Sequence, residues 1–176
     1  KAQSLAMRRN VKWETSSISP ETRALRYGQR PGAVIITGPR DVGKKEIAKL
    51  LEAELWSEGR QVYFLGIGNL LYGVAGEIKT EGEVPARYEH MRRLGEVANI
   101  MTDAGTLLIV TAADLGVKDI DVLSAAFDRE HIHTVWAGGE VTTDIVPELR
   151  ISDVSDRQLT VARIKSFMAE KGLIFA

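Results

Sequence analysis

The stretch that decides the fold of this chain is Ala33-Val34-Ile35-Ile36-Thr37-Gly38-Pro39-Arg40-Asp41-Val42-Gly43-Lys44. Its first five residues are mostly apolar and β-branched without strict alternation, which is typical of a strand buried on both faces. Gly38, Gly43 and Lys44 then follow with the spacing of a phosphate-binding loop, in which backbone N–H groups, a helix N-terminus and a lysine surround an anion. We therefore predict a phosphate-binding loop between a strand and a helix.

The residues that this loop would bring to a nucleotide, sulfate or phosphate are consecutive in the chain. They are Gly38, Pro39, Arg40, Asp41, Val42, Gly43, Lys44 and Lys45. The alternative is a glycine-rich turn that arises by chance, but the strand before it and the helix pattern after it favour the phosphate-binding interpretation.

Helices and strands alternate outward from the loop. The apolar patterns predict strands over residues 33–37, 61–65, 106–111, 134–136 and 149–152, and helices over 44–58, 86–104 and 117–128. A capping box over Ser155–Gln158 predicts a final helix that continues to Lys171. This alternation indicates an α/β fold with three layers, namely a doubly wound, mostly parallel five-stranded sheet of the P-loop kinase type.

The first thirty residues are polar and basic. Ser19 and Pro20 predict the start of one short helix, and Gly28 and the Pro31-Gly32 pair break the chain after it. We therefore expect residues 1–30 to be an N-terminal linker with one helix and residues 31–176 to be the P-loop domain. A frayed tail is an equally good interpretation of residues 1–10.

Composition limits the remaining possibilities. The 176 residues carry a formal net charge of −1, so no global charge favours nucleic acid or an anionic membrane as a partner. The chain has no cysteine, which excludes disulfides, thiolate zinc sites and a cysteine nucleophile. We expect a cytoplasmic domain whose ligand is a nucleotide or a sulfate or phosphate anion.

Lys45 departs from the pattern of an active loop. A phosphate-binding loop normally continues from its lysine to a serine or threonine whose hydroxyl is a magnesium ligand, whereas the ammonium of Lys45 repels a cation. We expect ATP as a cofactor, magnesium as a doubtful one, and Lys44 as the catalytic residue if the domain is active. Asp114, after the third strand, is either a metal anchor that compensates for Lys45 or, with more weight, a turn residue before Gly116.

Several segments resemble the adenylylsulfate (APS) kinase family, over about residues 10–172. They are Asn10–Trp13, the strand, loop and helix within Gly32–Leu51, Tyr63–Asn69, and above all Arg87–Ala98 followed by Thr102–Gly105. The resemblance implies transfer of phosphate from ATP to adenylylsulfate, giving 3′-phosphoadenylylsulfate. It also implies that Asn69, Arg87 and Arg92 bind the acceptor, although arginines on a solvated helix face are the alternative.

The departures from the family fall on its chemistry. Gly66 and Gly68 stand where the family has acidic residues, Leu71 stands where it has arginine, and Thr111–Leu115 replaces a segment that contains Ser-Pro. The segment between Trp136 and Leu149 is too short for the family's basic lid. We therefore expect a domain of sulfate activation in which catalysis is weakened or lost.

Two other functions stay open at this point. The chain could be a non-catalytic interface domain joined to the GTPase-like subunit of a sulfate adenylyltransferase, or a P-loop kinase for another small substrate. A homodimer also stays open as its oligomeric state. His131 and His133 favour packing over metal binding because no third ligand is near them in sequence. Tyr72, Tyr88 and Trp136 are either core residues or the walls of a base-stacking pocket.

Overall fold

The computed structural model describes residues 13–66 and 86–176. Its five strands form one sheet in which every pairing is parallel, in the order β2-β3-β1-β4-β5. The strands are β1 (Gly32–Gly38), β2 (Val62–Leu65), β3 (Leu107–Ala113), β4 (Ile132–Ala137) and β5 (Leu149–Ile151). The predicted five-stranded α/β fold is confirmed, and the sheet is wholly parallel rather than mostly so.

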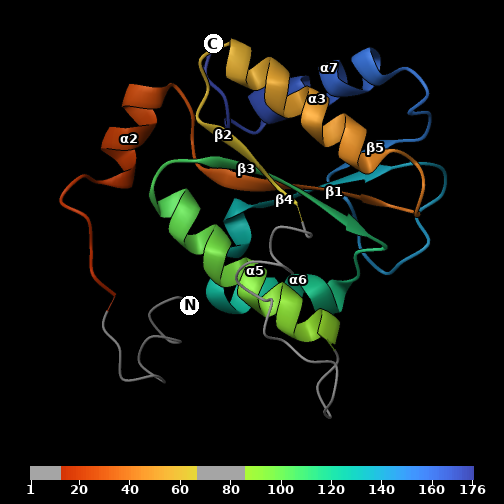
Figure 1. Ribbon diagram of the computed structural model, residues 1–176, viewed down its shortest axis with the longest axis horizontal. Coiled ribbons are helices and arrows are strands. Elements are labelled where there is room, and N and C mark those ends of the chain that lie inside the picture. The colour runs from red at the N-terminus through yellow and green to blue at the C-terminus, as the bar shows by residue number, and fades with distance from the viewer. Residues whose placement is uncertain (1–12, 67–85) are drawn as a thin grey trace.

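Helices cover both faces of the sheet (Figure 1). They are α2 (Pro20–Tyr27), α3 (Lys44–Ser57), α5 (Ala86–Asp103), α6 (Val117–Ala126) and α7 (Arg157–Glu170), with the single turn η1 (Arg129–His131) before β4. Among the described residues, none of these helices has both the length and the apolar character to cross a bilayer.

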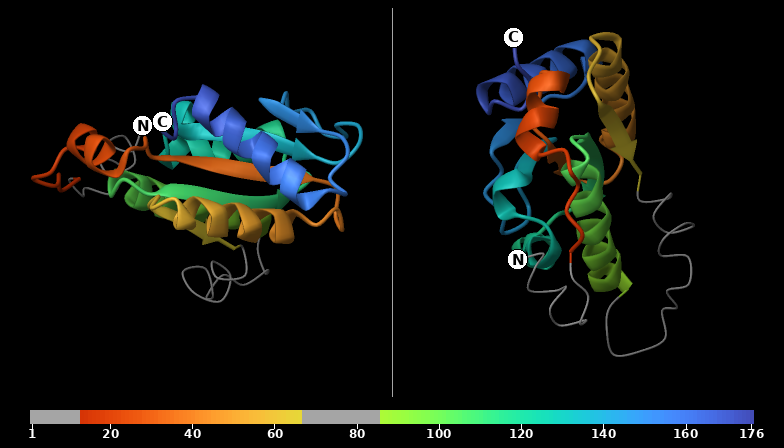
Figure 2. Two further views of the ribbon diagram at one scale, coloured as in Figure 1. Left: turned by 90° about the horizontal axis from the view of Figure 1, so that it is seen from above. Right: turned by 90° about the vertical axis from the view of Figure 1, so that its left-hand side faces the viewer.

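Each face of the sheet has its own apolar core. Val34 and Ile36 of β1 pack with the buried side of α3 and α7, whereas Ala33 and Ile35 pack with α5 and α6. Figure 2 shows the sheet between these two helical layers. A strand buried on both faces has no polar side, which explains why the sequence of β1 does not alternate.

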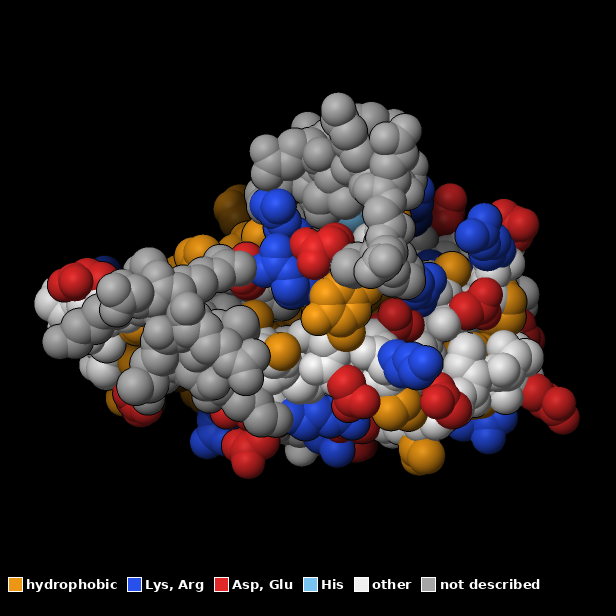
Figure 3. Space-filling model, turned by 90° about the horizontal axis from the view of Figure 1, so that it is seen from below, with side chains coloured by type: hydrophobic (Ala, Val, Ile, Leu, Met, Phe, Trp, Pro, Cys, Tyr) orange, Lys and Arg blue, Asp and Glu red, His pale blue; other side chains and the backbone are white. Residues whose placement is uncertain are grey.

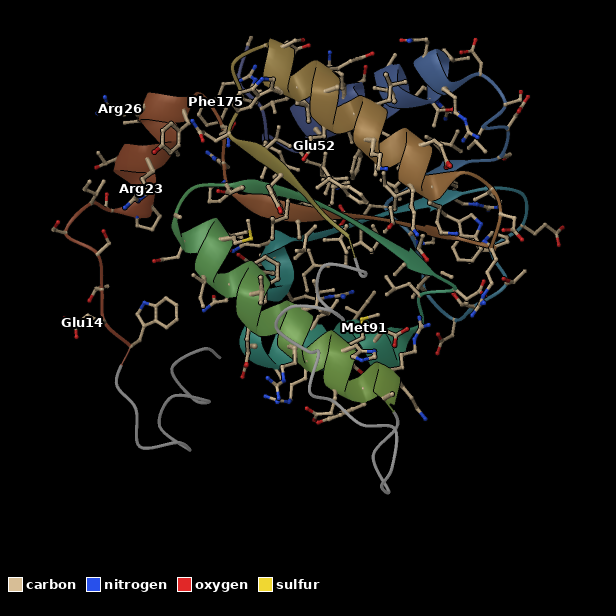
Figure 4. All side chains as sticks on the ribbon, viewed as in Figure 1. Glu14, Arg23, Arg26, Glu52, Met91 and Phe175 are labelled. Atoms are coloured by element: carbon tan, nitrogen blue, oxygen red, sulfur yellow. The ribbon has the colours of Figure 1, made fainter. Side chains whose placement is uncertain are left out.

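The layer of α5 and α6 presents intermixed acidic and basic side chains to the solvent (Figure 3). Part of this mixture consists of ion pairs within α5, such as Arg92 with Glu96. On its inner side α5 buries Met91, which points toward the sheet (Figure 4), together with Leu94 and Ala98. The apolar stripe predicted for this helix is therefore the stripe that it buries.

The segment before β1 is attached to the body of the domain. Ser19 caps α2, as predicted, and the helix ends at Gly28, which has a φ of 65°. Gln29 is fully buried, and its side-chain amide donates to the carbonyls of Gln61 and Gly105. The guanidinium of Arg60 also holds the carbonyls of Gly28 and of Phe175, which lies at the other end of the chain (Figure 4). The division of the chain at residue 30 stays a prediction.

The start of α7 differs from the prediction. Asp156 is the N-cap, and its side chain accepts from the N–H of Leu159, while the hydroxyl of Ser155 donates to Asp153. The predicted capping box over Ser155–Gln158 is therefore wrong by one residue, because Ser155 is already used in a turn with Asp153. The shift makes Arg157 the first residue of the helix.

Candidate functional site

A cavity of about 790 Å³ lies at the carboxyl ends of β1 and β3. Open parallel sheets bind ligands at this edge, because the loops that leave the strands diverge there. Four cationic side chains (Arg40, Lys44, Lys45 and Arg157), two acidic ones (Asp41 and Glu46), Gly43 and the end of β3 over Thr111–Ala113 line the cavity. The predicted loop thus forms one wall of a basic cavity.

The backbone of the loop is shaped by two glycines. Gly38 has a φ of 145°, and a side chain there would collide with the carbonyl of Ala137 in β4. Gly43 has a φ of 89° and is the N-cap of α3, so the helix begins with no side-chain cap. Its first N–H groups are left to bind an anion. Asp41, between the two glycines, is a non-glycine residue with a φ of 65°, so the loop uses the left-handed region there as well.

Lys44 is held over the loop that precedes it. Its Nζ donates to the carbonyl of Pro39 at 2.5 Å. Burial lowers the pKa of Lys44; the carboxylates of Asp114 and Asp41 oppose this shift, and the charge of Arg40 adds to it. A bound phosphate would stabilise the ammonium in the same place, so Lys44 is arranged for an anion that lies on the loop.

Arg157 is a part of the site that sequence reasoning missed. Its Nη1 donates to the carbonyls of Val42 and Gly43, at 3.2 Å and 3.1 Å. These contacts cross more than a hundred residues, so no local pattern points to them. One signal was available, because Arg157 follows a strand of a parallel sheet and therefore lies at the same edge as the loop.

Asp114 lies beside the cavity in a turn. It has a φ of 49°, its N–H donates to the carbonyl of Gly38, and the N-cap of the following helix is Gly116. The backbone of Asp114 therefore lies in a turn, as the second interpretation of this residue expects. Its carboxylate is exposed and acts on the charges of both Lys44 and Arg87. Over residues 13–66 and 86–176, no group of three or more His, Asp or Glu side chains could hold a metal ion.

The structure separates the two predicted acceptor arginines. Arg87 lies at the start of α5 and donates from Nη2 to the carbonyl of Ala113, one of the residues that line the cavity. Arg92 is held by Glu89 and Glu96 of its own helix, at 3.0 Å each. Five positions along a helix turn a side chain by roughly 140°, so the two arginines project in different directions. Asn69 lies outside the described residues.

The two histidines named from the sequence pack on opposite sides of the sheet. His133 packs against Phe167 on one side of the sheet, whereas His131 packs against Phe127, which belongs to the opposite core. The two rings therefore cannot share a ligand. Trp136 is a buried core residue, Tyr88 is 46% exposed, and Gly68, Leu71 and Tyr72 lie outside the described residues.

The segment between β4 and β5, which we predicted to be too short for a lid, is a short connection. Residues 138–148 join β4 to β5 without a helix or strand. Thr143 donates to the carbonyl of Leu115, and Asp144 accepts from the N–H of Val117 at 2.9 Å. The connection is thus held against the start of α6.

The chain is similar in sequence to known adenylyl-sulfate kinases. Residues 30–115 match the family model described as Adenylylsulphate kinase. An adenylyl-sulfate kinase of Aeromonas hydrophila is 36% identical over 103 residues, which cover 58% of this chain and 51% of that protein. The bifunctional enzyme NodQ of Rhizobium sp. (strain N33) is 36% identical over 109 residues, which are 61% of this chain and 16% of that protein.

Solved structures of an APS kinase share the fold. Two structures of the Mycobacterium tuberculosis APS kinase CysC superpose with TM-scores of 0.69 and 0.67, at 23% and 20% identity, and each comparison covers 80% of this chain and 99% of that one. One of them is a complex with AMPPNP and APS. The chain spans about half the length of the curated adenylyl-sulfate kinases that it matches.

Proposed function

We propose that this chain, whose residues 30–115 match the family model described as Adenylylsulphate kinase, is a member of that family and a nucleotide- and anion-binding domain of sulfate activation in which phosphoryl transfer is weakened or lost. The family reaction would transfer phosphate from ATP to adenylylsulfate. The observation that carries the proposal is the basic cavity over the Gly38–Lys44 loop. The loop keeps its phosphate-binding backbone, but Lys45 replaces the hydroxyl that a magnesium-dependent reaction uses.

ATP is the nucleotide that we propose. A relative in fold forms a complex with AMPPNP and APS, and the cavity of this chain has the lysine and the helix N-terminus that polyphosphates bind. Lys44 would stabilise charge on the phosphates if transfer occurs. Phosphoryl transfer depends mainly on positioning and charge stabilisation, so the loss of a metal ligand reduces its main source of rate.

Product formation from ATP and adenylylsulfate tests this proposal. We expect binding of ATP in a calorimetric titration, but turnover no faster than that of the Lys44→Met variant prepared in the same way. Comparison with this variant separates the activity of the domain from that of a contaminating kinase. Turnover far above the variant would show that catalysis is intact, and absence of any nucleotide binding would contradict the proposed function.

The acceptor site is the second part of the proposal. Asn69, Arg87 and Arg92 are proposed to bind adenylylsulfate, with the guanidinium of Arg87 reaching the edge of the cavity through its contact with Ala113. Arg87→Gln and Arg92→Gln should each weaken adenylylsulfate binding, while Arg163→Gln, on the exposed side of α7, should not. Equal affinities for all three variants would remove both arginines from the site.

A non-catalytic interface domain is the alternative that a specific observation favours. The matching region of NodQ is a small part of a longer bifunctional chain, which supports a similar place for this domain beside a second enzyme, for which we propose a sulfate adenylyltransferase. Gel filtration with a purified GTPase-like sulfate adenylyltransferase subunit tests the contact, and the chain alone in the same experiment tests the homodimer. We also propose a cytoplasmic location for the domain.

A kinase for another small substrate would need Asp114 as its metal anchor. In that case Asp114→Asn would weaken the magnesium-dependent affinity for ATP. An unchanged affinity would remove this reading.

A further inference from the structure

The cavity over the phosphate-binding loop is unusually rich in positive charge for a site that would also hold a divalent cation. Lys44 and Lys45 are adjacent at the start of α3, and Arg40 and Arg157 complete the cationic lining. Asp41 and Glu46 are the two acids in the same wall. Cations outnumber acids two to one, so the lining itself can neutralise much of the charge of a polyphosphate.

The residues that surround the loop do not fit magnesium. Magnesium binds oxygen ligands in near-octahedral geometry and in nucleotide sites takes one or two carboxylates or hydroxyls from the protein. The residue after Lys44 offers an ammonium instead, which has three donors and no acceptor. Within the described part of the chain no group of three or more His, Asp or Glu side chains could hold a metal ion, and the two acids of the lining lie among its four cations. The donor set therefore favours an anion without its metal.

Arg157 brings a positive charge to the cavity from outside the loop. Its Nη1 is fixed by the carbonyls of Val42 and Gly43. Both hydrogen bonds come from this one nitrogen, so Nη2 and Nε are left to donate to a ligand in the cavity. A guanidinium anchored in this way loses little conformational freedom when it binds an anion, and arginine suits the planar recognition of phosphate.

From this arrangement we infer that the cavity binds a polyphosphate in its metal-free form, with Lys45 and Arg157 supplying the positive charge that a divalent cation brings elsewhere. The inference rests on the proposed function, and it names the ionic form of the nucleotide that the site selects. Lys45 acts at the start of α3 and Arg157 acts from the start of α7, so the anion is held between two helices that begin at the same edge of the sheet.

Calorimetric titrations with ATP and with inorganic tripolyphosphate test the inference, each in EDTA and in excess magnesium. The wild-type chain should bind both probes in EDTA at least as tightly as in magnesium. Lys45→Met and Arg157→Gln should each weaken metal-free binding about tenfold, the effect expected from one charge-assisted hydrogen bond. Lys45→Ser should weaken metal-free binding likewise and shift the preference toward the magnesium complex, because it restores the hydroxyl ligand.

Two variants serve as matched controls for charge and place. Lys49→Met removes an exposed lysine of α3, and Arg163→Gln removes an exposed arginine of α7; neither residue lines the cavity. Both should bind the probes as the wild-type chain does, and circular dichroism of every variant verifies the fold. Binding of ATP only in magnesium, or unchanged metal-free affinity in Lys45→Met and Arg157→Gln, would overturn the inference and leave the nucleotide site in place. Absence of binding under both conditions would overturn the proposed function as well.

Discussion

Arg87 and Asp119 form a two-point ion pair, in which Nε and Nη2 of the arginine each lie 3.0 Å from one carboxylate oxygen. The same carboxylate accepts the N–H of Gly116, and the same guanidinium donates to the carbonyl of Ala113. The pair therefore ties the start of α5 to the start of α6 and to the end of β3. An anion that binds Arg87 must share the guanidinium with Asp119 or displace it.

Asp119→Asn should destabilise the fold in a pH-dependent way. Burial alone would raise the pKa of Asp119, but hydrogen bonds from Arg87 and Gly116 and the charge of Arg87 hold this pKa below its ordinary value. A carboxylate with a lowered pKa stabilises the folded state above the unfolded-state pKa of about 3.9, and this contribution disappears as pH falls through the folded-state pKa. We expect a loss of about 1–2 kcal/mol near neutral pH.

Urea unfolding of wild type and Asp119→Asn, from neutral to strongly acidic pH, measures this effect. The difference in unfolding free energy between the two proteins should shrink as the pH falls. Asp121→Asn is the control, because Asp121 is exposed on the same helix. A difference that stays constant with pH would show that the ion pair does not contribute through its charge.

Gly43→Ala should damage both stability and anion binding. The residue has a φ of 89°, and a Cβ at this position would collide with the guanidinium of Arg157. Gly59 has a φ of 83° with nothing near its Cβ position, so Gly59→Ala pays only the backbone strain of about 1 kcal/mol. Thermal unfolding and tripolyphosphate titration of both variants should show strain in each and loss of binding in Gly43→Ala alone. Equal binding by the two variants would contradict the proposed role of the Arg157 contact.

Gln29→Leu should loosen the attachment of the N-terminal segment. The substitution leaves the N–H of Gln61 and the carbonyls of Gln61 and Gly105 without the partners that Gln29 provides. The carbonyl of Gly105 is buried and costs about 1–3 kcal/mol when it is left unsatisfied, whereas Gln61 is exposed and its carbonyl keeps the N–H of Leu107, so we expect a total loss of about 1–3 kcal/mol. Urea unfolding measures it, with Gln158→Leu on the exposed side of α7 as the control. A loss as small as that of the control would mean that the segment is not held through Gln29.

Leu51→Ala should be among the most destabilising substitutions in α3. Leu51 is fully buried between α3 and the sheet, and truncation of such a leucine costs about 2–5 kcal/mol because it leaves a cavity. Leu159→Ala, at a position that is 59% exposed on α7, should cost less than about 1 kcal/mol. Denaturant unfolding at constant m-value compares the two, and similar losses would contradict the packing of this layer.

The sequence by itself determined the strands, the loop and the presence of Lys45 where a phosphate-binding loop normally has a serine or threonine. Residues 33–37 are apolar without alternation, because a central parallel strand has no polar face. Gly38, Gly43 and Lys44 have the spacing of a phosphate-binding loop, a pattern that depends on the local backbone alone. Patterns of this kind depend on neighbouring residues, so the strands and helices could be predicted, and Lys45 could be recognised, without the structure.

Only the tertiary structure decided which distant side chains complete the site. Arg157 meets Gly43 because α3 and α7 lie on the same face of the sheet and both begin at its carboxyl edge. Arg87 meets Asp119 because α5 and α6 share the opposite face. Strand order and the choice of face are set by packing across the whole chain and leave no mark at the residues concerned. For this reason the sequence located the loop, whereas the structure identified Arg157 as a further cation of the cavity beside it.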